Sequence, residues 1–460
     1  MKNITATDFY DYTKCKYCVF LNKNGNLDLR DKISDFVRLL WDRGVQHEDK
    51  VIEHIKNNDK EKKFAEVSKD KPANTETFTE TIELMKRGVD YIYQGVLAAD
   101  NFIGRPDLLE KIIGKSKLGN YYYIPVDIKA GRGYEGDDAG EGKVKESYLF
   151  QLDFYNLLLS KIQNFKPEFG KIINIDREEL KYETNFNDEK FSKIKEEITL
   201  MTNGSELYQP TIGGKCGLCR WQTYCNNWAK KKRDLSLLFY VGENKYSLQE
   251  YGIKQIKELL IKPLEDWLKE LPTIKKQGHF KGFAEKSFSN AYKRAQVYEK
   301  GKEVFYSKAK FPESQKEIHF DIEDDPTQDI TYLFGFYIRD LSGGQNHYEY
   351  LMADEIDGEK EIAEKLWNFM GKNKNVPFFH YSSHEISTLR RLQTKYNLDK
   401  SVLDNFEKNA VDLYEIIKIC SDWPLTSYGL KSIGKFTGFK WSADDAGGAN
   451  SIEWFSRLLN

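Results

Sequence analysis

The chain has 460 residues, which is enough for two or three domains of ordinary size. Hydrophobic residues make up 40% and charged residues 31%, the balance of a soluble globular protein. The net charge of −2 excludes no class of partner, because a local cationic groove is enough to bind a polyanion. The first residues contain no apolar core and no run of 18 apolar residues occurs, so we expect neither a signal peptide nor a membrane span. We therefore expect a reducing cytoplasm, where paired thiols more often hold metal than form disulfides.

The chain separates into three zones with different residue patterns. The first, residues 1–230, mixes helical and strand-like stretches. The second, 231–313, is helical and rich in lysine, and its segment 251–260 is similar either to half of a helix-hairpin-helix or to a plain structural hairpin. The third, 314–460, opens with a strand and a hairpin whose turn is at Gly343-Gly344. The regular elements that we expect are helices at 31–56, 145–162 and 362–370, and strands at 91–97, 121–128, 171–175, 318–323, 332–338 and 376–380.

Two aspartates and a lysine in the first zone have the spacing of a hydrolytic metal site. Gly104-Arg105-Pro106-Asp107 lies in a strand-like stretch, and Asp127 follows later in Pro125-Val126-Asp127-Ile128-Lys129. Asp127 and Lys129 are two apart on a predicted strand, so both side chains point to the same face. Two carboxylates can hold a hard divalent ion, and a lysine beside them can orient or deprotonate water and stabilise negative charge.

Four further side chains extend this pattern. Tyr148, Gln151 and Tyr155 are three or four positions apart, so they share one face of the helix predicted at 145–162. Upstream, His47 stands after a helix, in the segment 44–48. The pattern thus has the order His, Pro-Asp, Asp-x-Lys, Gln-x-x-x-Tyr.

This order resembles the RecB-type branch of the PD-(D/E)xK nucleases, over residues 1–230. The resemblance implies a restriction-endonuclease-like α/β core that uses Mg²⁺ or Mn²⁺. The residues that it places in the site are His47, Asp107 and Asp127 as metal ligands, Lys129 as the catalytic lysine, and Gln151 and Tyr155 as positioning residues. The family more often has glutamate where Asp127 stands, and the shorter arm of aspartate would shift the metal.

Cysteines frame the same zone. Cys216, Cys219 and Cys225 form a C-x2-C-x5-C segment, while Cys15 and Cys18 lie about two hundred residues earlier. A C-x2-C pair alone suggests zinc, and three close thiols with a distant fourth also suit an iron–sulfur cluster. CRISPR-associated and helicase–nuclease members of the RecB-like family carry such a triplet with one N-terminal cysteine, which together hold a 4Fe–4S cluster. The resemblance implies that Cys15 and the triplet bind this cluster, with Cys18 as the alternative fourth ligand and zinc as the alternative metal.

A second acidic pattern opens the third zone. Asp321 and Glu323 share one face of a predicted strand, and this pair resembles the first motif of DEDD-type exonucleases, which use two metal ions. Segment 381–389 resembles their second motif, with Glu385 where aspartate is usual. Segments 427–431 and 447–452 resemble YprB-type ribonuclease H-like domains, which are fused behind RecB-like nuclease domains. The third exonuclease motif would come after residue 460, so we expect this domain to be incomplete at its C-terminus.

These patterns predict an α/β protein with a restriction-endonuclease-like core, a helical middle region and a ribonuclease H-like C-terminal domain. The predicted activity is metal-dependent hydrolysis of DNA phosphodiester bonds, acting on single-stranded DNA or DNA ends in repair, recombination or defence. A helicase or another repair protein is the expected partner. The alternatives are a catalytically weak nucleic-acid-binding module and an RNA-directed exonuclease that acts through the third zone.

Overall fold

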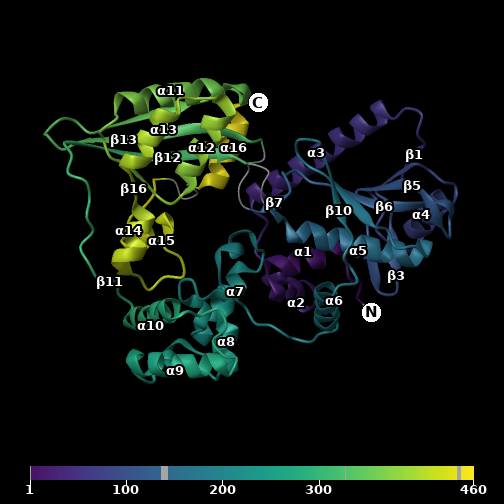
Figure 1. The fold of residues 1–460 in the computed structure, drawn as a ribbon, viewed down its shortest axis with the longest axis horizontal. Coiled ribbons are helices and arrows are strands. Elements are labelled where there is room, and N and C mark those ends of the chain that lie inside the picture. Colours follow the sequence, from purple (N-terminus) through teal and green to yellow (C-terminus); the bar gives the residue numbers. More distant parts are fainter. Residues whose placement is uncertain (1, 136–142, 327, 443–446, 460) are drawn as a thin grey trace. The chain divides into compact units, whose positions relative to one another are not determined.

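The computed structural model describes residues 2–135, 143–326, 328–442 and 447–459. The chain folds into two compact units, which are described one at a time (Figure 1). The first contains residues 1–33, 37–210 and 218–224, and the second contains 34–36, 211–217 and 225–460. No helix among the described residues is long and apolar enough to cross a membrane. The finer division at residues 230 and 313 stays a prediction.

A six-stranded mixed sheet forms the centre of the first unit, in the order β1-β2-β5-β6-β9-β10. β5 and β6 form an antiparallel hairpin, and β9 lies parallel to β6 on its other side. β6 is central and is buried over most of its length, as expected for a strand covered on both faces. The strands are β1 (Phe64–Glu66), β2 (Tyr91–Tyr93), β5 (Leu108–Ser116), β6 (Gly119–Ile128), β9 (Phe169–Ile173) and β10 (Glu179–Glu183).

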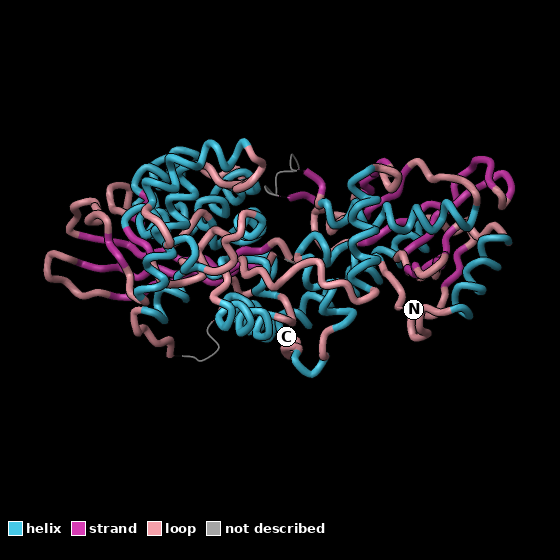
Figure 2. The backbone as a smooth tube through the Cα atoms, turned by 90° about the horizontal axis from the view of Figure 1, so that it is seen from below, coloured by secondary structure: helices cyan, strands magenta, loops and turns pink. Residues whose placement is uncertain are grey.

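Helices lie beside the strands of this unit (Figure 2), and among them α5 (Glu146–Gln163), labelled in Figure 1, contributes many buried side chains to the core. It forms where the sequence predicts a helix. Because apolar residues lie on several of its faces, the helix is buried. α1 (Ala6–Lys14) packs on it through Phe9, whose ring centroid lies 5.2 Å from that of Phe154. The other elements are α2 (Lys16–Asn24), α3 (Asp35–Asn58), α4 (Thr75–Lys86), α6 (Glu189–Thr202), and the hairpins β3 (Leu97–Ala99) with β4 (Phe102–Gly104) and β7 (Tyr134–Glu135) with β8 (Lys143–Val144).

Two sequence expectations for this unit are wrong. His47 lies inside α3 rather than after a helix. The helix continues through Gly44 because a glycine inside a helix costs only about 1 kcal/mol, which the other residues of this long element offset. Asp107 lies between β4 and β5 rather than inside a strand, because Pro106 has no N–H to donate to a strand ladder.

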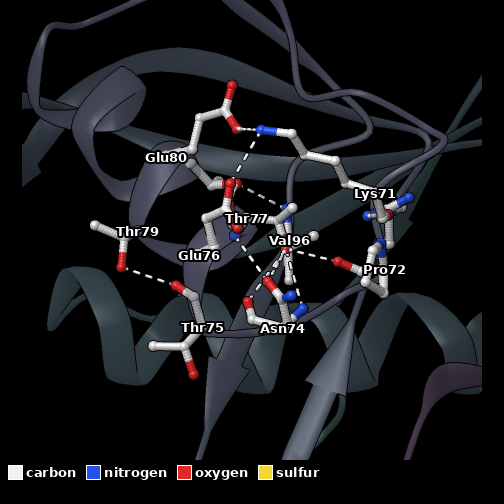
Figure 3. A network of polar contacts seen from close by, with 11 residues as sticks. Lys71, Pro72, Asn74, Thr75, Glu76, Thr77, Thr79, Glu80 and Val96 are labelled. Atoms are coloured by element: carbon white, nitrogen blue, oxygen red, sulfur yellow. Dashed lines mark hydrogen bonds and ion pairs between the residues drawn. The ribbon is translucent and has the colours of Figure 1, made fainter.

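A polar network at the start of α4 holds the chain that leads to the candidate site (Figure 3). Asn74 accepts a hydrogen bond from the N–H of Thr77 at 3.1 Å and caps the helix. One turn later the buried Thr81 hydroxyl donates to the Thr77 carbonyl at 2.8 Å and accepts from the backbone N–H of Val96 at 2.8 Å. Thr81 therefore holds the backbone at Val96, and the Asn74 cap holds the start of the helix that carries Thr81.

We expect Thr81→Val to lower the free energy of unfolding by about 1–3 kcal/mol, because the buried N–H of Val96 loses its acceptor while the side-chain volume is nearly kept. Urea denaturation measures this change. Thr79→Val is the matched control, because the exposed Thr79 hydroxyl bonds only the Thr75 carbonyl of its own helix and its replacement changes stability by at most about 0.5 kcal/mol. Equal effects of the two changes would contradict the role given to Thr81.

The second unit begins with a helical region. It contains α8 (Lys245–Glu250), α9 (Leu264–Lys276) and α10 (Glu285–Lys300). Segment 251–260, which is similar in sequence to half of a helix-hairpin-helix or to a plain structural hairpin, contains a short 3-10 helix over Ile256–Leu260. Gln255 before it is extended and bridges to Asp234, and Pro263 follows it, so the segment has room for little more than one turn.

A five-stranded sheet forms the rest of the second unit, in the order β14-β13-β12-β15-β16. β12 is central, antiparallel to β13 and parallel to β15. The strands are β12 (Lys316–Asp325), β13 (Ile330–Asp340), β14 (His347–Met352), β15 (Phe378–His380) and β16 (Ala410–Asp412). The helices are α11 (Glu359–Lys372), α12 (His384–Tyr396), α13 (Lys400–Asn409), α14 (Leu413–Cys420), α15 (Leu430–Phe436) and α16 (Gly448–Leu458), and β11 (Val304–Phe305) pairs with β17 (Ser421–Asp422).

Candidate active site

Asp107, Asp127 and Lys129 come together at one end of the β5–β6 hairpin in the first unit. Asp107 directly precedes β5, and Asp127 is the next-to-last residue of β6. The antiparallel register places the start of β5 beside the end of β6. Lys129 continues β6, because its N–H donates to the carbonyl of Ile173 at 2.9 Å. The hairpin therefore positions all three side chains on rigid backbone.

The Asp107 carboxylate is held in a low-polarity site next to other acids. Its Oδ2 accepts a hydrogen bond from the N–H of Ile128 at 2.6 Å. Burial raises the pKa of Asp107 to about 8, and the charges of Asp127 and Glu48 add to the effect, against Lys129 and the Ile128 bond. Carboxylates that share a site repel each other when both are ionised. A divalent cation between them would relieve that repulsion, so this acid pair fits a metal site.

Lys129 forms an ion pair with Asp127 and lies within electrostatic reach of Asp107. Its Nζ lies 2.9 Å from Asp127 Oδ2, an oxygen that is buried and accepts no aligned hydrogen bond among the described residues. Burial disfavours the charged amine, but the attraction of Asp127 and Asp107 outweighs burial and raises the pKa of Lys129. The Tyr148 ring lies under the ammonium, with 5.4 Å from Nζ to the ring centroid. Lys129 is therefore a cation at neutral pH.

Helix α5 contributes Gln151 and Tyr155 to this region. Burial and then the charges of Asp127 and Asp107 raise the pKa of Tyr155, whose hydroxyl donates to the carbonyl of Arg105 at 3.2 Å. Gly104 makes room for the ring, because a Cβ there would lie 2.8 Å from it. One turn earlier, the Gln151 amide oxygen is buried and accepts no hydrogen bond among the described residues. Such an oxygen is available to a water or a substrate group.

His47 is buried and is hydrogen-bonded through one ring nitrogen. Its Nε2 lies 3.1 Å from the carbonyl oxygen of Asn174, which can only accept, so Nε2 carries the proton. Burial lowers the pKa of His47, although the Asn174 bond opposes this, so the imidazole is neutral. This arrangement leaves Nδ1 with a lone pair, and metal-bound histidines commonly fix their tautomer in this way.

Two residues near the aspartates were missed by the sequence reasoning. Glu48 accepts hydrogen bonds from the Tyr93 hydroxyl and from Gln94 Nε2, both at 2.7 Å, and its charge reaches Asp107. Gln94 has a left-handed backbone with φ 56°, and its N–H donates to the carbonyl of Asp107 at 2.9 Å. Gln94 thus holds both acids. The only sequence signal for Glu48 is its place beside His47, and Gln94 has none.

The thiols divide between the two units. In the first unit a hydrogen bond between Cys18 and Cys219 raises the pKa of Cys18 and lowers that of Cys219 to about 7. Cys15 is close enough to Cys18 for its charge to add to the rise. In the second unit the Cys216 sulfur lies 3.6 Å from the carbonyl of Thr211, and Cys225 is buried.

The second acidic pattern also converges. Burial raises the pKa of Asp321 and of Glu323, and each is raised further by a neighbouring acid, Glu385 for Asp321 and Asp321 for Glu323. Glu385 stands in the first turn of α12 and is buried, with its Oε2 3.4 Å from Nδ1 of His380. The three residues predicted from sequence for this site therefore lie together at the carboxyl side of the central strands.

Within the part of the chain that the structure describes, no three His, Cys, Asp or Glu side chains are arranged to hold a metal ion. At the first site the Lys129 ammonium lies 2.9 Å from Asp127 Oδ2. A metal would have to compete with that contact, and the poorly satisfied oxygen of Asp127 is where it fits best.

Comparison with protein families identifies both domains. Residues 9–226 match the PD-(D/E)XK nuclease superfamily, and residues 318–460 match the RNase_H superfamily. No match to a curated protein was found. The chain therefore contains a PD-(D/E)XK nuclease domain and a ribonuclease H-like domain with a helical region between them, which confirms the predicted fold class. Both are domains of nucleic-acid hydrolases, of the kind that typically use Mg²⁺ or Mn²⁺.

Proposed function

We propose that the protein hydrolyses DNA phosphodiester bonds with Mg²⁺ or Mn²⁺ at the site of Asp107, Asp127 and Lys129. Single-stranded DNA or DNA ends are the proposed substrates, in repair, recombination or defence, with a helicase as a possible type of partner. The observation that carries the proposal is the ion pair of Lys129 with Asp127. A second aspartate, Asp107, lies beside this pair, and its pKa is raised by burial to about 8. Clustered titratable groups with perturbed pKa values are typical of catalytic sites.

The proposed roles of Asp107, Asp127, Lys129 and Tyr155 follow from their surroundings, whereas those of His47 and Gln151 come from the sequence pattern. Asp107, Asp127 and the neutral His47 would hold the divalent cation, which supplies polarisation of the phosphoryl oxygen and an acidified water. Lys129 is charged, so it orients water and stabilises developing negative charge rather than accepting a proton. Gln151, through its buried amide oxygen, and Tyr155, beside both aspartates, position the substrate or the water.

The test is cleavage of labelled single-stranded DNA, duplex DNA and RNA, with and without Mn²⁺, by the parent and by Asp127→Asn. The proposal expects Mn²⁺-dependent cleavage of DNA that Asp127→Asn loses. If no strand is cut under any of these conditions, the catalytically weak binding module replaces the nuclease. If RNA alone is cut, the DNA specificity is wrong.

We expect Gln94→Gly to weaken Mn²⁺ binding by about 10- to 100-fold, because the change removes the hydrogen bond that orients Glu48 beside Asp107. Glycine accepts the left-handed backbone without strain, so the turn and its bond to the Asp107 carbonyl are kept. Isothermal titration of the metal-free protein with Mn²⁺ measures the affinity. An unchanged affinity would mean that Glu48 does not contribute to the metal site.

The C-terminal acids support a second candidate, an RNA-directed exonuclease. The observation that favours it is the buried Glu385, which lies within electrostatic reach of Asp321 and whose Oε2 accepts no aligned hydrogen bond among the described residues. Asp321→Asn and Asp127→Asn separate the two sites. RNA cleavage lost only in Asp321→Asn would assign it to the ribonuclease H-like domain, and loss only in Asp127→Asn would reject this candidate.

We also propose a 4Fe–4S cluster bound by thiolates, with zinc as the alternative metal. The C-x2-C-x5-C spacing supports the triplet Cys216, Cys219 and Cys225. The N-terminal ligand is Cys15 or Cys18, and the contact of Cys18 with Cys219 supports the second as a candidate. Iron and zinc analysis of anaerobically purified protein, with the visible spectrum, distinguishes the metals. Retention of iron in Cys15→Ser with its loss in Cys18→Ser would assign the fourth ligand, and the reverse result would restore Cys15.

A further inference from the structure

One face of the ribonuclease H-like sheet is packed and the other is largely open. Phe336 contacts Phe369 of α11 with ring centroids 4.3 Å apart, and Phe320 contacts Phe406 of α13 at 5.8 Å. Side chains alternate along a strand, so the residues between these phenylalanines point to the opposite face. There Tyr337 is 44% exposed, although it lies on the strand next to the central one.

Six rings form a belt on this face, of which Phe379 is buried and the other five are partly or fully exposed. The strand register places His319, Tyr337 and Tyr348 in one row across β12, β13 and β14. His319 stacks on Phe379 of β15 with centroids 5.1 Å apart, and Phe379 contacts Phe311 at 5.9 Å. The remaining spacings are 6.2 Å between His319 and Tyr337 and 6.2 Å between Tyr348 and Tyr350. We call Phe311, Phe379, His319, Tyr337, Tyr348 and Tyr350 the aromatic belt.

The belt borders the second acidic site. The next row of the sheet joins Asp321, Gly335 and Tyr350, so only a glycine separates a belt tyrosine from the first catalytic candidate of this domain. A Cβ at Gly335 would lie 2.7 Å from the Tyr348 hydroxyl oxygen, so the absence of a side chain lets that ring lean over the sheet. Burial and the charges of Asp321 and Glu323 raise the pKa of Tyr348, as expected for a ring beside them.

We propose that the aromatic belt binds a single-stranded nucleic acid by stacking its bases and leads the strand to Asp321 and Glu323. Exposed rings spaced across a sheet stack bases of any sequence, and domains that bind single strands use sheet aromatics in this way. Exposure is greatest at Tyr348 and Tyr350, both 60% exposed on the edge strand. The proposal rests on nucleic acid being the substrate but not on which site cuts it.

Positive charge near the belt suits a polyanionic strand. Arg339 lies in the row next to His319 and is 42% exposed along its side chain, with Nη1 2.9 Å from Glu317. Exposed Lys308 and Lys310 precede Phe311 at the other end of the belt. Protein interfaces are also rich in tyrosine and arginine, so the rings alone do not identify the occupant. The acid pair Asp321 and Glu323 beside the belt, in a domain that matches the RNase_H superfamily, together with these cations favours a nucleic acid.

The test measures binding of a fluorescent oligothymidylate of about 15 nucleotides to the full chain in EDTA, where cleavage cannot occur. The double variant Tyr348→Ala, Tyr350→Ala is expected to bind at least about tenfold more weakly, because each ring that is removed takes away the stacking of one base. Tyr348→Phe with Tyr350→Phe keeps the rings and is expected to bind like the parent. The second control is His347→Ala with Glu349→Ala, which changes the same edge strand on its other face.

Photo-crosslinking localises the contact, because the nuclease domain also binds strands. An oligonucleotide that carries 5-iodouracil is expected to crosslink to Tyr337, Tyr348 or Tyr350, in a DNA arm, an RNA arm or both, which identifies the strand. Unchanged affinity in the alanine pair together with no crosslink to the belt overturns the proposal. So does loss of self-association in the alanine pair with unchanged strand binding, which would assign the belt to a protein contact. None of these readouts requires cleavage at Asp107 and Asp127.

Discussion

A Lys129→Met protein is expected to cleave DNA at least about a hundredfold more slowly than the parent, because a positioned cation beside the reacting phosphate contributes at least this much. Methionine keeps most of the length of the lysine side chain and removes only its charge. In the parent, the Lys129 ammonium lies 2.9 Å from Asp127 and is the positive group that Asp107 senses. The rate of Mn²⁺-dependent cleavage of labelled single-stranded DNA measures the effect.

The chain offers a closely matched control lysine. Lys171 lies on β9, paired in register with Val126 of β6, and its side chain is 19% exposed against 20% for Lys129. It also forms ion pairs with carboxylates, at 2.7 Å with Glu110 and 3.0 Å with Glu179. Lys171→Met therefore removes an equally buried, equally paired cation from the neighbouring strand but not from the acid site.

The comparison separates catalysis from folding. Both changes leave carboxylates without their cation, so both are expected to lower stability, and thermal melting reports by how much. Only Lys129→Met should also lower the cleavage rate at a temperature where both proteins are folded. If the two variants cleave equally, the PD-(D/E)XK site of this chain does not use its lysine, and the proposed assignment of roles is wrong.

The parts of the site that sequence reasoning could find are those with a local period. Asp127 and Lys129 are two apart on a strand, and Gln151 and Tyr155 are four apart on a helix, so their shared faces follow from backbone geometry alone. The fold class was anticipated from the resemblance of these motifs to known nuclease families, and local periods placed only single helices and strands.

The parts that could not be found depend on contacts between distant segments. Glu48 is part of the acid site because Gln94 and Tyr93, on another segment, hold its carboxylate. Gln94 has a left-handed backbone, but it is not a glycine, so the sequence gives no sign of this conformation. His47 was expected to follow a helix, although the helix predicted at 31–56 already includes it, and in the structure it lies inside α3. The choice between Cys15 and Cys18 likewise depends on which thiol meets Cys219.

The second large effect concerns pH. We expect the free energy of unfolding of the metal-free protein to fall as pH rises toward 8, and Asp107→Asn to remove most of this fall. In the folded protein burial and the neighbouring acids raise the pKa of Asp107 to about 8, whereas an unfolded aspartate has a pKa of about 3.9. Between these values the folded chain holds a proton that the unfolded chain has released. The stabilisation that comes from the Asp107 proton is therefore fully present below a pH of about 3.9, the unfolded pKa. It is lost as pH rises through the folded pKa of about 8.

The experiment compares the parent with Asp107→Asn by urea denaturation in EDTA between pH 6 and 8. One coupled proton limits the slope to about 1.4 kcal/mol per pH unit. Burial raises the pKa of Asp153 to about 6, so Asp153 affects the pH dependence of stability mainly below this window. The other titratable groups are the same in both proteins, so their contributions cancel in the difference. Parallel curves would show that Asp107 is already ionised at pH 6, and a preformed anionic pair would then have to be stabilised by Lys129 alone.

Binding of Mn²⁺ provides a second measurement of the proton on Asp107. A cation that binds ionised Asp107 must displace its proton, so below pH 8 binding should release close to one proton and weaken as pH falls. Isothermal titration in buffers of different ionisation enthalpy counts that proton. Asp107→Asn should abolish both the release and most of the affinity, whereas Asp153→Asn should change neither, because the Asp153 carboxylate accepts the N–H of Asn185 and is absent from the charges that reach Asp107. Binding that releases no proton would place the metal elsewhere in the chain.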